Sequence, residues 1–196
     1  EREVILDSHI EVRPIDIKFS EAAVAKGTGR VEIAFVDPEQ VLVDRDNPKF
    51  ITSGNTKYQW ARMEKKSKAT TPELTTYCSN GKRKYFTPTL MSELNTNAGL
   101  KSTISVNDYK NDNNRVWLYF DENLYASKDG QRDCMLLLSY YDSDSDTQPD
   151  YEYFAFHQHD LFPVEYGGKK YYIEYNEEYL YNFDPKDNFG ITTDGM

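Results

Sequence analysis

The sequence predicts an all-β fold, one or two β-sandwiches with one short helix. Short segments in which apolar and polar residues alternate recur along the chain, as in strands with one buried face. Turn signals rich in Gly, Pro and Asn separate these segments at the spacing typical of a sandwich. Tyrosine and phenylalanine, which favour strands, occur 16 and 10 times among the 196 residues. A chain of this length can bury a substantial core.

The first half of the chain contains several predicted strands. The stretch "HIEVRPIDIKF" (9–19) changes its apolar parity at Pro14, which predicts two short strands or an edge strand with a bulge. The stretch "RVEIAFV" (30–36) alternates throughout and puts Val31, Ile33 and Phe35 on one face. Shorter predicted strands are "QVLVD" (40–44), "KYQWARM" (57–63) and "STISV" (102–106).

A short helix is predicted at 88–97, where Thr87 provides an N-cap, Pro88 the first helical position and Gly99 a stop. Upstream of it, "EKKSKATTPE" (64–73) has the composition of a linker. We therefore expect a module boundary within 64–88. It would separate a β-rich module (1–87) from a second module (88–196) that contains the helix and a sandwich.

The segment 115–158 predicts an antiparallel meander of three strands. "RVWLYFDE", "RDCMLLLSYY" and "YEYFAFHQ" are joined by loops that contain Asp129-Gly130 and Pro149. The middle strand is apolar on both faces, so we expect it to be central. Side chains alternate between the two faces of a strand, so the meander has two different faces. We expect one face, which includes Phe154 and Phe156 of the third strand, to point to the core, and the other face to be rich in Trp and Tyr. The core face of the first strand consists of Val116, Leu118 and Phe120.

The aromatic face has two interpretations. Exposed flat rings on a sheet can stack on the C–H face of a sugar, so Trp117, Tyr119, Tyr151 and Tyr153 are candidate binding residues. In the alternative, a second layer of the sandwich covers these rings, because an all-β domain needs two layers around its core.

The tyrosine-rich stretch "YYIEYNEEYLYNF" (171–183) predicts a strand, broken near Asn176, although a helical pattern fits nearly as well. The residues that follow, 184–196, are rich in turn formers. We expect the chain to be truncated at this end.

The composition argues against several classes of function. A formal net charge of −10 disfavours nucleic-acid binding, because a basic surface is needed to neutralise phosphates. No apolar run approaches the length of a transmembrane helix. The two cysteines, Cys78 and Cys134, fit no zinc spacing and are either free thiols or one disulfide.

Two clusters are weak metal candidates. Asp142, Asp144 and Asp146 alternate as in a calcium loop but lack its Gly and its Glu, so we interpret them as a solvated acidic turn. His157 and His159 share a strand face, but two ligands do not make a zinc site. The sequence contains no nucleophile elbow, phosphate-binding loop or dinucleotide fingerprint. We expect a non-enzymatic protein without a cofactor.

The second half of the chain resembles cell-surface proteins of the Bacteroidetes. The resemblance rests on "VNDYKNDNNRVWLYFDENL", "RDCMLLLSYYDSD" and the stretch that begins with "YFAFHQHDLFPVEYGG" and runs to the end. These segments are similar to fimbrillin-like lipoproteins with Ig-like β-sandwich modules. The pattern at 115–161 also resembles the Bacteroidetes-associated carbohydrate-binding module BACON. Gln158 matches the Thr-Gln-x-Gly ending of that module, whereas its Thr and Gly have no counterpart here.

The resemblance implies an Ig-like fold, export to the outer cell surface and a non-enzymatic role in fimbria assembly or adhesion. The implied partners are surface protein subunits, or glycans of host or microbial origin. The alternative function is a carbohydrate-binding module that uses the aromatic face.

Overall fold

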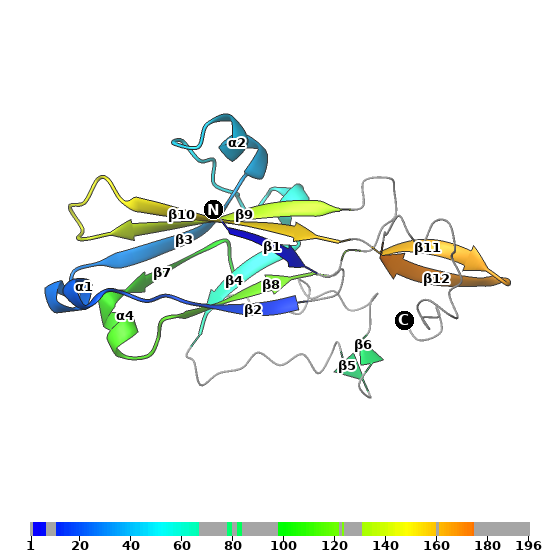
Figure 1. Ribbon diagram of the computed structural model, residues 1–196, viewed down its shortest axis with the longest axis horizontal. Helices are drawn as coiled ribbons and strands as arrows, with labels where there is room; N and C mark the ends of the chain where they lie inside the picture. The colour runs from blue at the N-terminus through cyan, green and yellow to red at the C-terminus, as the bar shows by residue number, and fades with distance from the viewer. Residues whose placement is uncertain are drawn as a thin grey trace.

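The computed structural model describes residues 2–6, 11–66, 78–79, 82–83, 98–121, 123, 131–159 and 161–174. These residues form mostly strands in two main sheets, with few and short helices (Figure 1). The all-β prediction is therefore confirmed. Across these ranges, no helix is long and apolar enough to cross a membrane.

The two main sheets differ in size. The larger one has the strand order β1 (Arg2–Leu6), β10 (Asp150–Gln158), β9 (Arg132–Tyr141), β3 (Arg30–Val36) and β7 (Lys101–Ser105). Strand β1 pairs with β10 in parallel, whereas the other neighbours are antiparallel. The smaller, antiparallel sheet has the order β2 (Glu11–Asp16), β8 (Arg115–Phe120) and β4 (Ala61–Lys65).

The core lies between these sheets. Its main cluster of buried side chains draws on both, with Val31, Ile33 and Phe35 from β3, Leu136 and Leu138 from β9, and Val116, Leu118 and Phe120 from β8. The rings of Phe120 and Phe156 meet across the core with their centroids 5.0 Å apart. The inward faces predicted for β3, β8 and β10 are thus confirmed.

The meander predicted at 115–158 is correct only for its second half. Strands β9 and β10 form the expected hairpin and β9 is central, but β8 lies in the smaller sheet. The second neighbour of β9 is β3, with Ile33 opposite Leu138. The prediction of three strands in one sheet is wrong because β8 and β10 reach the same core from opposite layers.

The module boundary expected within 64–88 does not divide the two sheets. Strands β1 and β3 pair with β10 and β9, and both β2 and β4 pair with β8. Strands from both sides of that boundary therefore share both sheets and one core.

The proline in the first predicted segment lies at a sheet edge. Strand β2 is an outer strand of the smaller sheet, and its Pro14 lies opposite Trp117 of β8. Proline has no N–H to donate, which an edge strand tolerates. The edge position expected for this segment agrees with the structure, whereas the expected bulge is not formed, since β2 pairs with β8 in continuous register from Glu11 to Asp16.

The predicted strand at 40–44 is wrong, since Pro38–Val43 form helix α2. The carboxylate of Asp37 accepts a hydrogen bond from the backbone N–H of Glu39 at 3.0 Å, and Pro38 occupies the first turn. Val41 is the buried residue of the helix and packs on the larger sheet. The cap and the proline outweigh the strand preference of the two valines.

The other described helices are also short. They are α1 (Glu21–Lys26), α4 (Val106–Lys110) and the 3₁₀ helix η1 (Thr56–Tyr58). Helix η1 occupies the start of the strand predicted at 57–63, and β4 begins only at Ala61. The strand predicted at 102–106 is confirmed as β7, and the helix predicted at 88–97 lies outside the described residues.

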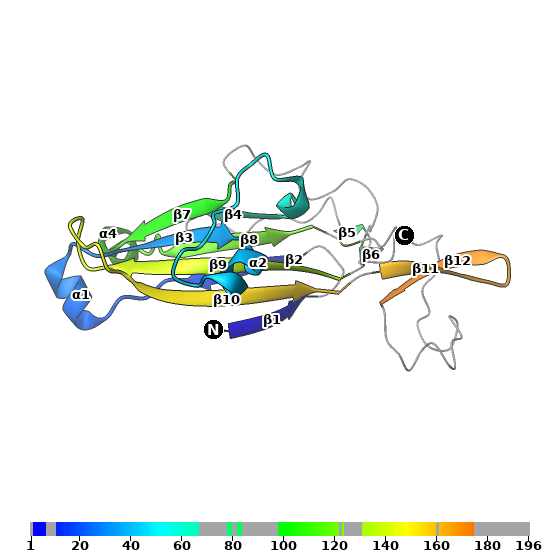
Figure 2. The ribbon, with the colours of Figure 1, turned by 90° about the horizontal axis from the view of Figure 1, so that it is seen from above.

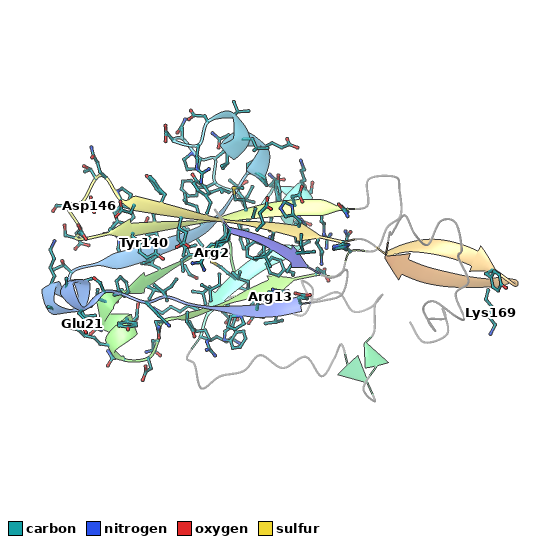
Figure 3. The ribbon with its side chains drawn as sticks, viewed as in Figure 1. Arg2, Arg13, Glu21, Tyr140, Asp146 and Lys169 are labelled. Carbon is teal, nitrogen blue, oxygen red and sulfur yellow. The ribbon has the colours of Figure 1, made fainter. Side chains whose placement is uncertain are left out.

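Two hairpins lie apart from the main sheets. The longer one, β11 (Leu161–Tyr166) and β12 (Lys169–Glu174), extends away from them (Figure 1 and Figure 2), with Lys169 at its tip (Figure 3). The strand predicted over 171–183 is confirmed for 171–174, and the rest of it lies outside the described residues. The shorter hairpin joins β5 (Cys78–Ser79) to β6 (Lys82–Arg83).

Candidate functional site

The four candidate aromatic residues lie in two different sheets. Trp117 and Tyr119 belong to β8, whereas Tyr151 and Tyr153 belong to β10. The exposed fraction is 8% for Trp117, 2% for Tyr119 and 3% for Tyr153, against 54% for Tyr151. The single aromatic face expected from the sequence is not formed, because its two strands lie in opposite layers. Of the four rings, Tyr151 is the one open to a ligand.

Trp117 and Tyr119 have structural contacts within the smaller sheet. The Tyr119 hydroxyl donates to the carboxylate of Glu64 on the neighbouring strand β4, at 3.3 Å. Burial, together with this carboxylate, raises the pKa of Tyr119 above its ordinary value. The guanidinium of Arg115 lies 5.4 Å from the centre of the Trp117 ring.

Tyr153 holds the loop that follows α2. Its hydroxyl donates to the backbone carbonyl of Arg45 at 2.9 Å, and the Arg45 guanidinium lies over its ring at 4.8 Å. It belongs to a small buried cluster on the outer face of the larger sheet, which also contains Val36, Val41, Met135, Leu137 and Ala155. Helix α2 therefore covers part of this outer face (Figure 2).

The acidic loop between β9 and β10 uses its carboxylates to fix its own backbone. The Asp146 carboxylate accepts hydrogen bonds from the N–H groups of Asp142 and Gln148, both at 2.9 Å, and these bonds lower its pKa. Arg30 donates to the Asp144 carboxylate at 3.3 Å. The loop lies at the tip of the hairpin, where Figure 3 labels Asp146.

His157 and His159 lie at the end of β10. The Nδ1 atom of His157 is 2.7 Å from a carboxylate oxygen of Asp133, and its Nε2 atom is 3.7 Å from a carboxylate oxygen of Glu3. The backbone N–H of His159 donates to the carbonyl of Leu6. Within the part of the chain that the structure describes, no three His, Cys, Asp or Glu side chains converge as a metal site requires.

Gln158 forms a buried polar clasp with Arg132 and the backbone carbonyl of Asp121. The Gln158 side chain is 1% exposed; it accepts from Nε of Arg132 and donates to the Asp121 carbonyl, both at 2.7 Å. Arg132 also donates to this carbonyl at 3.0 Å, and its guanidinium lies 4.4 Å from the ring centre of Trp60. Burial lowers the pKa of Arg132 to about 10. The clasp joins β9 and β10 of the larger sheet to the end of β8.

Strand β1 forms one edge of the larger sheet, a position not predicted from the sequence. Among the described strands it pairs only with β10, so its other side presents backbone groups. Val4 and Leu6 pack against the core, whereas Ile5 is 58% exposed. Arg2 contacts β10 through Glu152, at 3.5 Å. The short apolar run Val4-Ile5-Leu6 is the signal in the sequence that could have indicated this strand.

A groove of about 1150 Å³, here called the outer groove, hollows the outer face of the larger sheet. Its floor comes from β7, β3, β9 and β10, and its wall from residues 46–53 after α2. Tyr151 lines the groove, as does Phe50, which is 56% exposed. Of these two rings, only Tyr151 is predicted from the sequence as a binding residue.

Comparisons with known proteins assign no family. No protein-family model matches the chain, and no curated protein matches it. The resemblance to Bacteroidetes surface proteins therefore stays a prediction.

Proposed function

We propose that this chain is a non-enzymatic module of the outer cell surface, associated with fimbriae or similar assemblies, which contacts neighbouring subunits through the edge of its larger sheet. The observation that carries the proposal is the edge position of β1, which among the described strands pairs only with β10. An edge strand can accept a strand from another chain, and the backbone hydrogen bonds then supply the affinity.

The side chains of β1 suit such pairing better than those of β2. Ile5 offers an exposed apolar side chain on β1, a strand that also carries the charged residues Arg2 and Glu3. Strand β2, by contrast, carries Pro14. Proline on an edge opposes the addition of a further strand, because it has no N–H to donate. We therefore place the contact at β1.

The strand pairing supports an Ig-like sandwich. In the Ig fold, strands B, E and D are neighbours in one sheet, and C, F and G are neighbours in the other. Here β2, β8 and β4 correspond to B, E and D, and β3, β9 and β10 correspond to C, F and G. Strand β7 departs from this pattern, because it pairs with β3 but follows β4 in the sequence.

Self-association tests the proposed edge contact. Sedimentation velocity at increasing concentration is expected to show dimers or larger species, which Ile5→Lys abolishes because lysine on an edge opposes strand pairing. Leu42→Lys is the matched control, since Leu42 is 85% exposed on α2, away from β1. A wild-type protein that stays monomeric, or an equal loss of association in both variants, would contradict assembly through β1.

The location is tested separately on intact cells that make the protein. A protease that does not cross membranes is expected to cleave the protein from outside. Full protection until the cells are lysed would contradict the proposed surface location.

A further inference from the structure

The register of the larger sheet explains the shape of the outer groove. Two rows of outward-facing side chains cross the four floor strands, the first formed by Thr103, Glu32, Ser139 and Tyr151 and the second by Lys101, Ala34, Leu137 and Tyr153. Ala34 and Ser139 are small and lie in the middle of these rows, whereas Tyr151 stands at one end. The difference in side-chain size hollows the floor.

Two exposed aromatic rings flank this floor. Tyr151 lies on β10, and Phe50 lies in the wall, where its backbone pairs with Val36 at the end of β3. Their exposed fractions are 54% and 56%. Two large rings left open in one groove indicate a binding surface, because such side chains are otherwise favoured in the core.

A third ring, Tyr141, is held in place beside them. The Arg30 guanidinium lies 4.2 Å from its centre, and Nε of Arg30 donates to the Glu32 carboxylate at 3.2 Å. Burial, together with the negative charge of the nearby Glu32 carboxylate, raises the pKa of Tyr141. Glu32 is thus compensated by Arg30, and Tyr141 is fixed before any ligand arrives.

The polar lining indicates an uncharged ligand. Glu32 is paired with Arg30, and the other charged side chains that line the groove, Asp46 and Lys101, have opposite signs. The net charge of −10 for the whole chain repels polyanions. The lining also carries hydroxyl and amide groups, from Thr52, Ser53, Thr103, Ser139 and Asn47. Such groups bond to alcohols, and flat rings contact an apolar ring face.

We propose that the outer groove binds a neutral oligosaccharide. Phe50 and Tyr151 stack on sugar rings, and the hydroxyl and amide groups of the floor and wall bond to the sugar hydroxyls. A sugar residue has both an apolar C–H face and many hydroxyl groups, which matches this combination. The groove lies on the face of the larger sheet, whereas the assembly contact is proposed at its β1 edge, so this proposal does not depend on the assembly role.

Affinity electrophoresis through gels that contain a soluble polysaccharide tests the groove. The neutral probes are mixed-linkage β-glucan, xylan and galactomannan, and polygalacturonate is the acidic comparison. At least one neutral probe is expected to retard the wild-type protein. Tyr151→Ala and Phe50→Ala should each weaken that binding by about tenfold, because each removes one stacking ring. Tyr151→Phe keeps the ring and should retain most of the binding.

Tyr166→Ala is the matched control, since Tyr166 is 49% exposed but lies on the β11–β12 hairpin. It should bind as the wild type does, and circular dichroism should show that every variant is folded. The proposal is overturned if no neutral probe retards the wild-type protein, if Tyr151→Ala and Phe50→Ala bind as tightly as Tyr166→Ala, or if only polygalacturonate binds.

Discussion

Replacement of Gln158 by leucine tests how the polar clasp joins the two sheets. Leucine is close to glutamine in size, but it has no polar atoms. The variant removes the acceptor of the Arg132 Nε donor at a site where Gln158 is 1% exposed. The Asp121 carbonyl keeps its bond from Arg132, so the main loss falls on the guanidinium.

The expected cost follows from these contacts. A buried donor without its partner costs about 1–3 kcal/mol, with charged groups at the upper end, and the lost bond to the Asp121 carbonyl adds about 1 kcal/mol. The extra apolar surface of leucine offsets a part of this sum. We expect Gln158→Leu to lower the free energy of unfolding by about 3 kcal/mol, a large share of the roughly 5–15 kcal/mol that stabilises a typical domain.

Urea unfolding followed by tryptophan fluorescence measures this change, since Trp60 lies against Arg132. Gln148→Leu makes the same replacement in the exposed β9–β10 loop and should change stability by less than about 0.5 kcal/mol. Combining Gln158→Leu with Arg132→Met should cost less than the sum of the single variants, because both act on one network. A loss below about 1 kcal/mol for Gln158→Leu would refute the reasoning.

Four further side chains give measurable expectations. Asp37→Ala removes the cap of α2 and should lower the free energy of unfolding by about 1 kcal/mol in urea; unchanged stability would contradict the capping role. Burial raises the pKa of Tyr58 and of Tyr140 from 10.0 to about 12, above the value in the unfolded chain. The contribution of these two tyrosines to the free energy of unfolding is therefore complete below pH 10 and is lost as the pH rises towards 12. The melting temperature should fall across that window, and a melting temperature that does not change with pH would contradict the raised pKa values. Burial also raises the pKa of the Cys134 thiol, so iodoacetamide at pH 8 should label its peptide in urea but not in the native protein, and native labelling would show that this thiol is accessible.

Alternation along a strand predicts its inward face but not its neighbours. In β3, Val31, Ile33 and Phe35 are regularly spaced, and the sequence alone identifies both the strand and its buried side. In β8, both faces are buried, so the pattern carries no information about the sheet to which it belongs. Its closeness to β9 in the sequence favours a hairpin, but the chain crosses to the other layer between these two strands.

The outer groove shows a similar limit. Tyr151 is predicted because it lies on an alternating strand, whereas Phe50 lies in a loop whose position depends on α2 and on the bridge to Val36. The start of α2 is visible in the sequence as Asp37-Pro38, which fits a turn as well as a capped helix. The loop wall could therefore not be placed over the sheet without tertiary contacts.

The parallel pairing of β1 with β10 sets an order of events during folding. Arg2 lies opposite Phe154, so the ribosome must make nearly the whole described chain before β1 can join the sheet. Contacts between such distant segments form late, because a long loop has to close. We expect pulsed hydrogen exchange during refolding to protect the amides of β9 before those of β1. A neighbouring molecule that recognises the edge of β1 would then distinguish completely folded copies from incomplete ones.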